Sequence, residues 1–490
     1  MLAPANIFEV KTRLFAEENR KWWTLASVAF ALFMIMLDNT VVNVALPSIQ
    51  RDLGIGVSEL EWVVTGYALS FAVLMLTGGK LADMYGRRRI FLVGLAIFTV
   101  SSLFCGLAGT AELLIAARVV QGVGAAFMMP ATLSIITATF PPKERGAALG
   151  IWAGVSAMAL AIGPLVGGLI TENIGWNWIF YVNVPIGLLG LVAARLIIRE
   201  SRDTSHEQRL DVPGLVTSGV ALFALVYALI EGNSKGWTSP LILGLFALAA
   251  ASGTAFVLLE LHQRLPMFDV KLFRNPTFAG ANVVALLVSL AMFGVFFFIS
   301  LFMQNVLGYS AVRAGVAFLP MTLLIIVVAP LAGKMSDRLG SRWLMAGGMT
   351  LLGCSLLIYA QLQPDSSYFS LLPAMLLGGV GMASTMTPMT AAALSSVPVD
   401  KAGVGSGMLN TFRQVGGSVG IALMGAILAS GSKSALANGA TQVDAFMSGL
   451  HHALYTSAVI AFCGALTAAL TIRSHAHARP AVDRVPETAA

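Results

Sequence analysis

The feature that most constrains this chain is a series of apolar runs, each about 20 residues long, separated by short polar links. A helical run of about 20 apolar residues crosses the ~30 Å hydrocarbon core of a bilayer. The runs predict spans at 24–47, 62–79, 90–108, 112–138, 146–171, 178–198, 211–230, 239–261, 277–305, 311–333, 342–361, 368–391, 403–428 and 450–472. We therefore expect an all-α membrane protein with 14 transmembrane helices.

Composition excludes several other classes of protein. Only 11% of the residues are charged, whereas a soluble domain has about 25%. A soluble enzyme, a secreted disulfide scaffold and a nucleic-acid-binding domain are therefore excluded. The 3 cysteines lie far apart, with neither disulfide nor metal-ligand spacing, so no metal site is expected.

Most basic residues lie on one side of the predicted membrane. Of the 30 Lys and Arg residues, 24 fall on the side of the N-terminus, four on the opposite side and two within spans. This excess predicts that both termini are cytoplasmic. We expect a multi-pass protein of the cell (inner) membrane. Residues 1–22 are then a cytoplasmic arm rather than a cleaved signal peptide, and 473–490 form a cytoplasmic tail.

An internal repeat relates the two halves of the chain. The sequence at 79–86 is GKLADMYG, and it recurs at 333–340 as GKMSDRLG. The second copy lies 254 residues after the first, which corresponds to eight predicted helices. This offset indicates a six-helix bundle at 23–198, cytoplasmic links with two inserted helices at 199–276, and a second six-helix bundle at 277–472. Parallel repeats of this kind are typical of transporters that rock around a central site.

Four motifs give the chain a family resemblance. They are LDNTVVNVALP at 37–47, GKLADMYGRRR at 79–89, RVVQGVG at 118–124 and GPLVGG at 163–168. With them the chain resembles the major facilitator superfamily, within it the fourteen-helix drug:proton antiporters. The resemblance implies the major facilitator fold and multidrug efflux. One departure is WNW at 176–178, where family members often have Trp-Arg-Trp.

Asp38 is the only carboxylate that lies deep within a predicted span. An ionised group there costs about 2.5–3.5 kcal/mol on insertion scales, so we expect it to handle protons or a cationic substrate. Arg118 is the candidate partner, because the two residues lie within about one helical turn of the same depth. Our hypothesis is that Arg118 stabilises ionised Asp38 until protonation or a cationic substrate releases the pair. A permanent structural ion pair is the alternative.

The loop at 79–89 is predicted to be a latch on the cytoplasmic side. Glycines at both ends allow close approach and a tight turn. Asp83 is placed to accept hydrogen bonds from the N-terminus of the helix that begins near Gly403, where the helix dipole favours an anion. The arginines also set the topology. The predicted latch residues are Gly79, Asp83, Gly86, Arg87, Arg88 and Asp337.

Other polar or small residues within spans complete the predicted site. The candidates for lining a cavity are Asn43, Gln121, Gln304, Asn410, Arg413 and Gln414. Arg413 either recognises an acidic group of the substrate or pairs with backbone carbonyls. The fifth span is predicted to be a bent, closely packed helix that serves as a hinge. The residues concerned are Gly154, Gly163, Pro164, Gly167 and Gly168. A role specific to the exchange of substrate for protons is the alternative.

The energy source is expected to be the proton gradient. The sequence has no phosphate-binding loop of an ATP-driven pump and no nucleophile–base arrangement of an enzyme, and no cofactor is expected. One proton exchanged for one monovalent cation moves no net charge, whereas export of a dication would be opposed by the membrane potential. A single deep carboxylate therefore favours neutral or monocationic substrates.

These observations predict a proton-coupled antiporter that exports amphiphilic, drug-like compounds by alternating access. The expected partners are small substrates, protons and the lipid bilayer, with no nucleic acid, and the protein is expected to be a monomer. A dedicated exporter of an endogenous metabolite or lipid is the first alternative. A membrane sensor that does not transport is the second.

Overall fold

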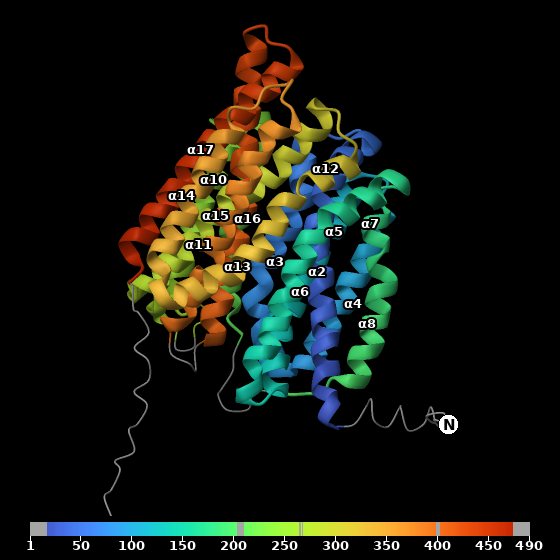
Figure 1. The fold of residues 1–490 in the computed structure, drawn as a ribbon, viewed down its shortest axis with the longest axis vertical. Helices are drawn as coiled ribbons and strands as arrows, with labels where there is room; N and C mark the ends of the chain where they lie inside the picture. The colour runs from blue at the N-terminus through green and yellow to red at the C-terminus, as the bar shows by residue number, and fades with distance from the viewer. Residues whose placement is uncertain (1–16, 203–209, 264–265, 267, 398–401, 474–490) are drawn as a thin grey trace, which may run out of the picture.

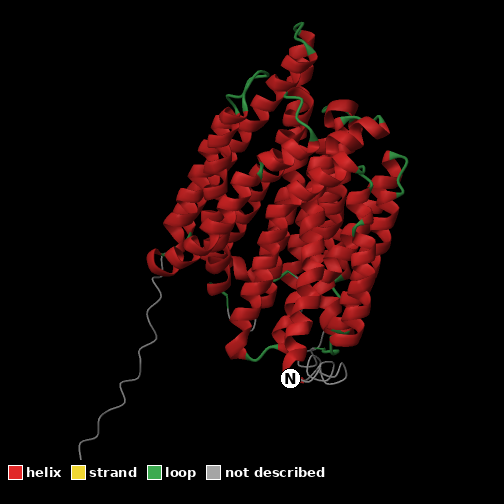
Figure 2. Ribbon diagram, turned by 45° about the vertical axis from the view of Figure 1, so that its right-hand side comes forward, coloured by secondary structure: helices red, strands yellow, loops and turns green. Residues whose placement is uncertain are grey.

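The protein is a set of long helices (Figures 1 and 2). A computed structural model describes the whole chain except residues 1–16, 203–209, 264–265, 267, 398–401 and 474–490. The first half contains α2 (Glu17–Leu53), α3 (Val57–Tyr85), α4 (Arg87–Gly106), α5 (Ala111–Thr139), α6 (Pro142–Asn173), α7 (Trp178–Tyr181) and α8 (Asn183–Ile197). Next come α9 (Val212–Lys235), α10 (Pro240–His262) and the short η1 (Val270–Arg274). The second half contains α11 (Pro276–Leu301), η2 (Phe302–Val306), α12 (Ala311–Ala317), α13 (Leu319–Leu339), α14 (Ser341–Tyr359), α15 (Tyr368–Ser395), α16 (Ala402–Ala437) and α17 (Gln442–Thr471).

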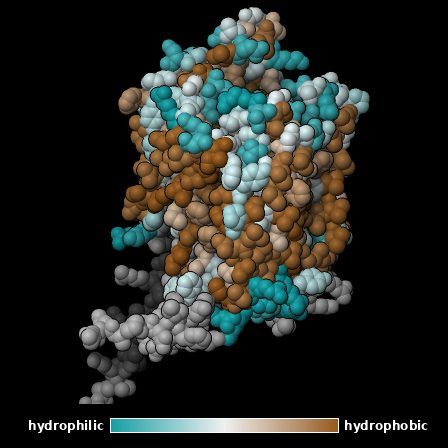
Figure 3. Space-filling model, turned by 90° about the vertical axis from the view of Figure 1, so that its right-hand side faces the viewer, coloured by the Kyte–Doolittle hydropathy of each residue, from teal (hydrophilic) through white to brown (hydrophobic). Residues whose placement is uncertain are grey.

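The helices confirm the predicted all-α membrane architecture. In the described part of the chain, 13 helical segments are long and apolar enough to cross a membrane. The 32-residue helix α6 covers the fifth predicted span, so every predicted span coincides with helix. Figure 3 shows the expected surface, with apolar residues around the middle and polar residues towards the two ends.

Three predicted spans are interrupted rather than continuous α-helices. The span predicted at 178–198 is divided between α7 and α8 at Val182. The span predicted at 277–305 ends in the π-helical turn η2. The span predicted at 311–333 breaks at Phe318, after which Pro320 stands in the first turn of α13. A proline is tolerated there, because the first turn has no intrahelical acceptor for its missing N–H.

The helices form two groups that pack mainly within themselves. In the first half, α5 packs on α3 and α4, α2 on α6, and α4 on α8. In the second half, α15 packs on α13 and α14, and α16 on α11 and α17. The described ends of the chain, at the start of α2 and the end of α17, lie at the same end of the molecule (Figure 1). We refer to this end as the inner end and to the opposite end as the outer end.

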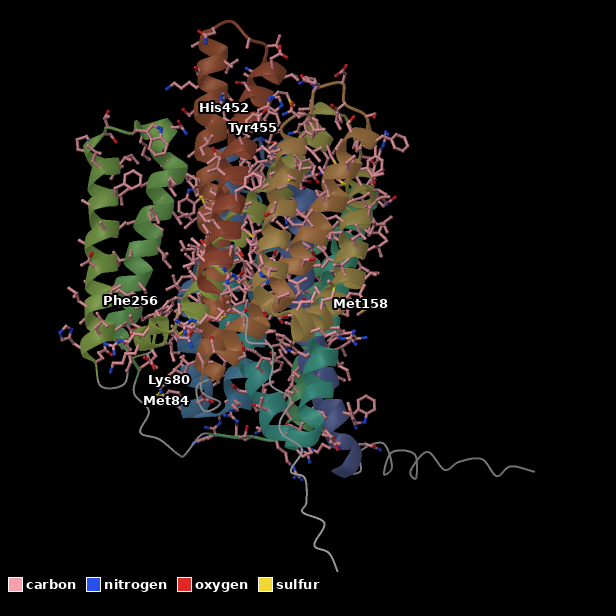
Figure 4. The ribbon with its side chains drawn as sticks, turned by 60° about the vertical axis from the view of Figure 1, so that its left-hand side comes forward. Lys80, Met84, Met158, Phe256, His452 and Tyr455 are labelled. Carbon is pink, nitrogen blue, oxygen red and sulfur yellow. The ribbon has the colours of Figure 1, made fainter. Side chains whose placement is uncertain are left out.

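The inserted helices α9 and α10 form a hairpin on the flank of the molecule (Figure 4). α9 packs against both α3 and α16, and its Val226 joins Leu69 and Ala422 in one apolar cluster. α10 packs mainly on α9. At the inner end, Gln263 Nε2 donates to Asp211 Oδ1 at 2.7 Å and ties the hairpin together. The hairpin therefore covers the line along which α3 and α16 meet.

The two groups meet along two seams. On one side α3 runs along α16, and on the other α6 packs against α12 and α13. At the outer end, the backbone N–H of Val312 in α12 donates to Glu172 Oε2 in α6 at 2.9 Å. A Cβ on Gly168 of α6 would lie 2.6 Å from the carbonyl oxygen of Ala311. A Cβ on Gly315 of α12 would overlap the carbonyl oxygen of Pro164. The outer part of this seam therefore requires glycine on both helices.

The predicted glycines of α6 have different surroundings. A Cβ on Gly163 would overlap the side chain of Thr40 in α2, and one on Gly167 would lie 2.9 Å from the backbone of Val41. Gly154 differs from the expectation of close packing, because no atom lies within 4 Å of the position that its Cβ would occupy. Close packing in α6 is thus found at the outer half of the helix.

This contrast gives a test with an internal control. We expect Gly168→Ala to lower the thermal unfolding midpoint of the purified protein, because the added methyl group meets the backbone of α12 and overpacking costs about 1–3 kcal/mol. Gly154→Ala adds the same methyl group to open space and should leave the midpoint unchanged or raise it slightly. Equal midpoints for the two variants would contradict the described seam.

Candidate functional site

Asp38 and Arg118 form an ion pair in the interior of the first group of helices. Asp38 lies near the middle of α2, and Arg118 lies in the second turn of α5, whose N-terminus is capped by the Thr110 side chain. Arg118 Nη1 donates to Asp38 Oδ2 at 2.6 Å, and the exposed fractions of the two side chains are 1% and 0%. The structure therefore brings together the two charges that the sequence placed at similar depth.

Amide and hydroxyl groups surround the carboxylate of Asp38. Gln121 Nε2 donates to Asp38 Oδ1 at 3.1 Å, and Asn183 Nδ2 donates to the same oxygen at 3.3 Å. Both amides also donate to Ser102 Oγ, at 3.2 Å and 3.0 Å. Ser102 in turn donates to the carbonyl of Phe180 at 3.0 Å. Both carboxylate oxygens of Asp38 therefore accept hydrogen bonds from buried donors.

Arg118 has further partners of its own. Its Nη1 also donates to Gln121 Oε1 at 2.6 Å, and its Nε donates to the carbonyl of Val63 in α3 at 3.2 Å. The guanidinium carbon lies 4.2 Å from the centre of the Tyr67 ring. A cation over an aromatic face is stabilised electrostatically. Arg118 would thus keep several partners if Asp38 became neutral.

The sequence analysis predicted Gln121 but missed Asn183 and Ser102. Both are almost completely buried, with exposed fractions of 1% and 0%. Asn183 stands at the start of α8 and Ser102 near the end of α4. Their only signal in the sequence is polarity within or beside an apolar run. Neither residue could be linked to Asp38 without knowing how α4 and α8 pack.

Three other predicted cavity residues donate hydrogen bonds to backbone carbonyls and not to this pair. Gln304, in the π-helical turn η2, donates to the carbonyl of Val44 in α2 at 2.9 Å, so it joins the two groups of helices. Asn43 and Asn410 each donate to a carbonyl one turn earlier in their own helix. π-Helical turns are frequent at functional sites.

Arg413 is separate from the Asp38–Arg118 pair. In the described part of the chain its buried Nε has no hydrogen-bond partner, and no ion pair to it is found. Its neighbour Gln414 accepts a hydrogen bond from Ser418 through its backbone carbonyl at 3.1 Å.

The loop between α3 and α4 lies at the inner end, where Figure 4 shows Lys80 and Met84. Gly86 forms the turn with a φ of 114°, a conformation that favours glycine. Asp83 pairs with Arg87 of the same loop at 3.1 Å. The expected contact with the start of the helix near Gly403 lies outside the described residues. Gly79 packs on the ring of Pro130 in α5. The side chain of Asp337 and the surroundings of Gly403 lie outside the described residues.

Glu200 is the partner of this loop that the sequence analysis missed. It follows α8, and its carboxylate accepts the backbone N–H groups of Arg88 at 3.0 Å and Arg89 at 3.2 Å. These N–H groups form the start of α4, where the helix dipole favours an anion. The loop is therefore held to its own half of the molecule by an anion at a helix N-terminus.

Two surface cavities contain none of the predicted site residues. One, of about 680 Å³, lies at the inner end of the second half and includes Arg274, Ser336 and Arg473 in its lining. The other, of about 490 Å³, lies at the outer end beside Asp52 and Trp176. There Trp176 Nε1 donates to Asp52 Oδ2 at 2.8 Å, so the WNW loop fastens α7 to the end of α2.

Burial is not limited to the one carboxylate that lies deep within a predicted span. Among the described residues, Asp38, Glu61, Asp211 and Glu260 all have exposed fractions of 5% or less. Glu61 lies inside a membrane-spanning helix, because α3 begins at Val57 and not at residue 62 as predicted. The hydropathy pattern excluded Glu61 from the span, since the apolar run starts one residue later.

The chain is similar to known resistance proteins. Residues 28–421 match the family described as Major Facilitator Superfamily. The chain is 37% identical over 411 residues to the tetracenomycin C resistance and export protein of Streptomyces glaucescens, with 84% of this chain and 76% of that protein covered. It is 38% identical over 452 residues to the puromycin resistance protein pur8 of Streptomyces alboniger, with 91% and 89% covered.

A third relative and a solved structure extend the comparison. The multidrug resistance protein Stp of Mycobacterium tuberculosis is 38% identical over 410 residues, which cover 83% of this chain and 76% of that protein. A bacterial homolog of the human lysosomal transporter Spinster, solved in an inward-facing and unoccupied conformation, superposes with a TM-score of 0.66. It is 18% identical, with 93% of this chain and 97% of that chain covered. This likeness shows the shared fold.

The buried ion pair predicts a specific pattern of stability. Arg118→Met leaves Asp38 buried without a counter-ion, and breaking such a pair costs about 3–5 kcal/mol. The double variant Asp38→Asn/Arg118→Met removes both charges and should recover most of this loss. The thermal unfolding midpoints of the purified variants test this. Arg51→Met serves as the control. It removes a positive charge from an exposed arginine and should change the unfolding midpoint little. Equal losses in the single and double variants would contradict the pairing.

Proposed function

Because this chain belongs to the Major Facilitator Superfamily, we propose that it is a proton-coupled exporter of amphiphilic, drug-like compounds. The family and the relatives named for drug and antibiotic resistance support a multi-pass membrane transporter in drug efflux. Coupling to protons, antiport and a preference for neutral or monocationic substrates go beyond these comparisons. They rest on the charges buried within the helices.

The observation that carries the proposal is the ion pair of Asp38 and Arg118 at 2.6 Å. In the unloaded transporter Asp38 is ionised and held by Arg118, Gln121 and Asn183. A proton on Asp38 removes its negative charge, so the attraction to Arg118 is lost. Arg118 then relies on Gln121 Oε1 and the carbonyl of Val63. Proton binding thereby changes how α2 is held to α3 and α5.

The proposed cycle uses the seams between the two six-helix bundles. α2 carries Asp38 and also contacts the second bundle, since Gln304 Nε2 donates to the carbonyl of Val44 at 2.9 Å. α6 packs on α2 as well as on α12. A change in how α2 is held therefore reaches the contacts with η2 and, through α6, with α12. These contacts must change when the bundles rock.

The surroundings of the transporter complete the proposal. Both termini face the cytoplasm, as the basic residues predict, and the protein acts as a monomer in the inner membrane. It uses the proton gradient without a cofactor. Residues 79–89, held by Glu200, keep the inner ends of α3 and α4 together during the movement.

A dedicated exporter of an acidic metabolite or lipid is the second candidate. The buried Nε of Arg413 has no hydrogen-bond partner in the described part of the chain, so an acidic group of a substrate would satisfy it. Competition by a panel of cationic, neutral and acidic compounds against dye efflux distinguishes the two candidates. A membrane sensor would show no efflux at all.

We expect Asp38→Asn to abolish proton-driven accumulation of a dye such as ethidium in everted membrane vesicles. Exchange of one proton for this monocation moves no net charge, so a difference of about two pH units supplies about 2.7 kcal/mol, enough for a gradient of about 100-fold. The variant should let the dye concentrations on the two sides approach equality. Asp444→Asn, at an exposed aspartate near the start of α17, should keep the wild-type gradient. A protonophore should collapse that gradient, and protonophore-sensitive accumulation by Asp38→Asn would contradict the proposal.

A further inference from the structure

Glu61 is a buried carboxylate that the ion pair at Asp38 does not use. It is the fifth residue of α3 and lies about 6 Å along the helix from its outer end. Its exposed fraction is 3%. Within the described part of the chain, no ion pair or hydrogen bond to its side chain is found. A carboxylate in such a place is strongly disfavoured as an anion and is stabilised by binding a proton.

The carboxyl group of Glu61 points across the seam into the second bundle. It lies directly over Gly425 of α16, where a Cβ would overlap its carboxyl oxygens. On the same α3 face, one turn before and one turn after Glu61, lie Ser58 and Thr65. Their hydroxyl oxygens are buried and have no hydrogen-bond partner. The seam therefore contains a small polar site whose groups have no hydrogen-bond partner in the described part of the chain.

The charged groups near Glu61 do not supply a counter-ion. On α9, Glu231 is itself acidic, and Lys235 is directed to the Tyr227 ring, 5.8 Å from the ring centre. On α3 itself Glu59 is exposed, and on α16 Lys433 is exposed near the outer end. None of these groups is placed to neutralise a negative charge on Glu61.

The inserted hairpin closes the remaining side of the site. Trp62 packs on Tyr227 of α9 with ring centres 5.9 Å apart. Asn233 of α9 donates to the carbonyl of Ala426 in α16 at 2.7 Å. Glu61 thus lies where one helix of each bundle and the hairpin meet.

The other buried carboxylates differ from Glu61 in having donors. Asp38 has Arg118. At the inner end, Asp211 accepts from Gln263 at 2.7 Å, and Glu260 accepts from the backbone N–H of Phe268 at 3.1 Å. Glu61 lacks such a donor and also lies on a seam that changes during transport. These two properties single it out as a site that gains and loses a ligand.

We propose that Glu61 is a second proton-binding residue of the transport cycle, and that the protein exchanges two protons for one dicationic substrate. This inference rests on the proposed function. Movement of α3 relative to α16 exposes Glu61 to water and releases its proton. Val63, two residues further along α3, accepts from Arg118 at 3.2 Å, so the two proton sites share a short stretch of backbone.

A second proton changes the expected charge of the substrate. With Asp38 alone, export of a dication moves one net positive charge out against the membrane potential. With Asp38 and Glu61 together, two inward protons balance one outward dication, and export moves no net charge. The preference for monocations drawn from a single deep carboxylate is thereby extended to dications.

Charge movement in proteoliposomes tests this inference. The probes are ethidium, a monocation, and propidium, its dicationic relative, in vesicles without a pH difference and with an imposed potential. Wild-type propidium transport should not respond to the potential, whereas ethidium transport should be driven by it. Glu61→Gln should reverse the pattern, with ethidium insensitive and propidium opposed. Each net charge changes the steady-state gradient by about 50-fold at 100 mV.

Controls separate this inference from the proposed function. Glu59→Gln, two residues away and exposed, should behave as the wild type. If the wild-type protein transports neither dye in response to a proton gradient, the proposed function fails. If it transports them and Glu61→Gln keeps the wild-type response to voltage for both dyes, only the present inference is overturned.

A measurement on the wild-type protein covers the case in which Glu61→Gln does not fold. Dicyclohexylcarbodiimide, an apolar reagent that modifies protonated carboxyl groups, is added to the protein in vesicles over a range of pH. Peptide mass mapping should find the label on Glu61, with labelling that declines as the pH rises, and none on exposed Glu59. Absence of label on Glu61 at low pH would overturn the proposal.

Discussion

The cost of burying a charge in hydrocarbon organises the interior of this protein. Asp38 and Arg118 meet that cost together, because each neutralises the other and the amides of Gln121 and Asn183 complete the carboxylate's hydrogen bonds. A pair of this kind is stable only while both partners keep their charge. In the proposed mechanism, one proton on Asp38 changes how α2 is held to α3 and α5, although the pair itself is closed to solvent. A deeply buried group can in this way respond to the gradient across the whole membrane.

α3 connects the main features of the structure. Its Val63 carbonyl accepts from Arg118, its Glu61 faces Gly425 of the second bundle, and its Leu69 packs on the inserted helix α9. Glycine and small residues along the seams allow backbones to approach closely, which favours a few discrete arrangements over continuous sliding. The inserted hairpin lies against the α3–α16 seam but not against the α6–α12 seam. The two seams are thus exposed to lipid to different degrees.

The sequence predicted the helices well, because a span is specified by a local run of apolar residues. The pairing of Asp38 with Arg118 was also predictable, since depth along a helix follows from residue counting. Asn183, Ser102 and Glu200 were not, because their importance depends on which helices pack together. Glu61 was missed for a different reason: hydropathy marks where an apolar run begins, whereas α3 continues outward to Val57. The interruptions at Val182 and Phe318 depend on tertiary packing as well as on local sequence.

The last two helices are longer than the hydrocarbon core of a bilayer. α16 has 36 residues and α17 has 30, which correspond to about 54 and 45 Å of helix against a hydrocarbon core of ~30 Å. They pack on each other and are joined by a turn in which Gly439 has a φ of 84°, so the projection in Figure 1 is a firm extension of the second half. It offers a rigid epitope outside the membrane. An antibody fragment bound there would add mass for single-particle imaging, and its tilt would report the orientation of the second half.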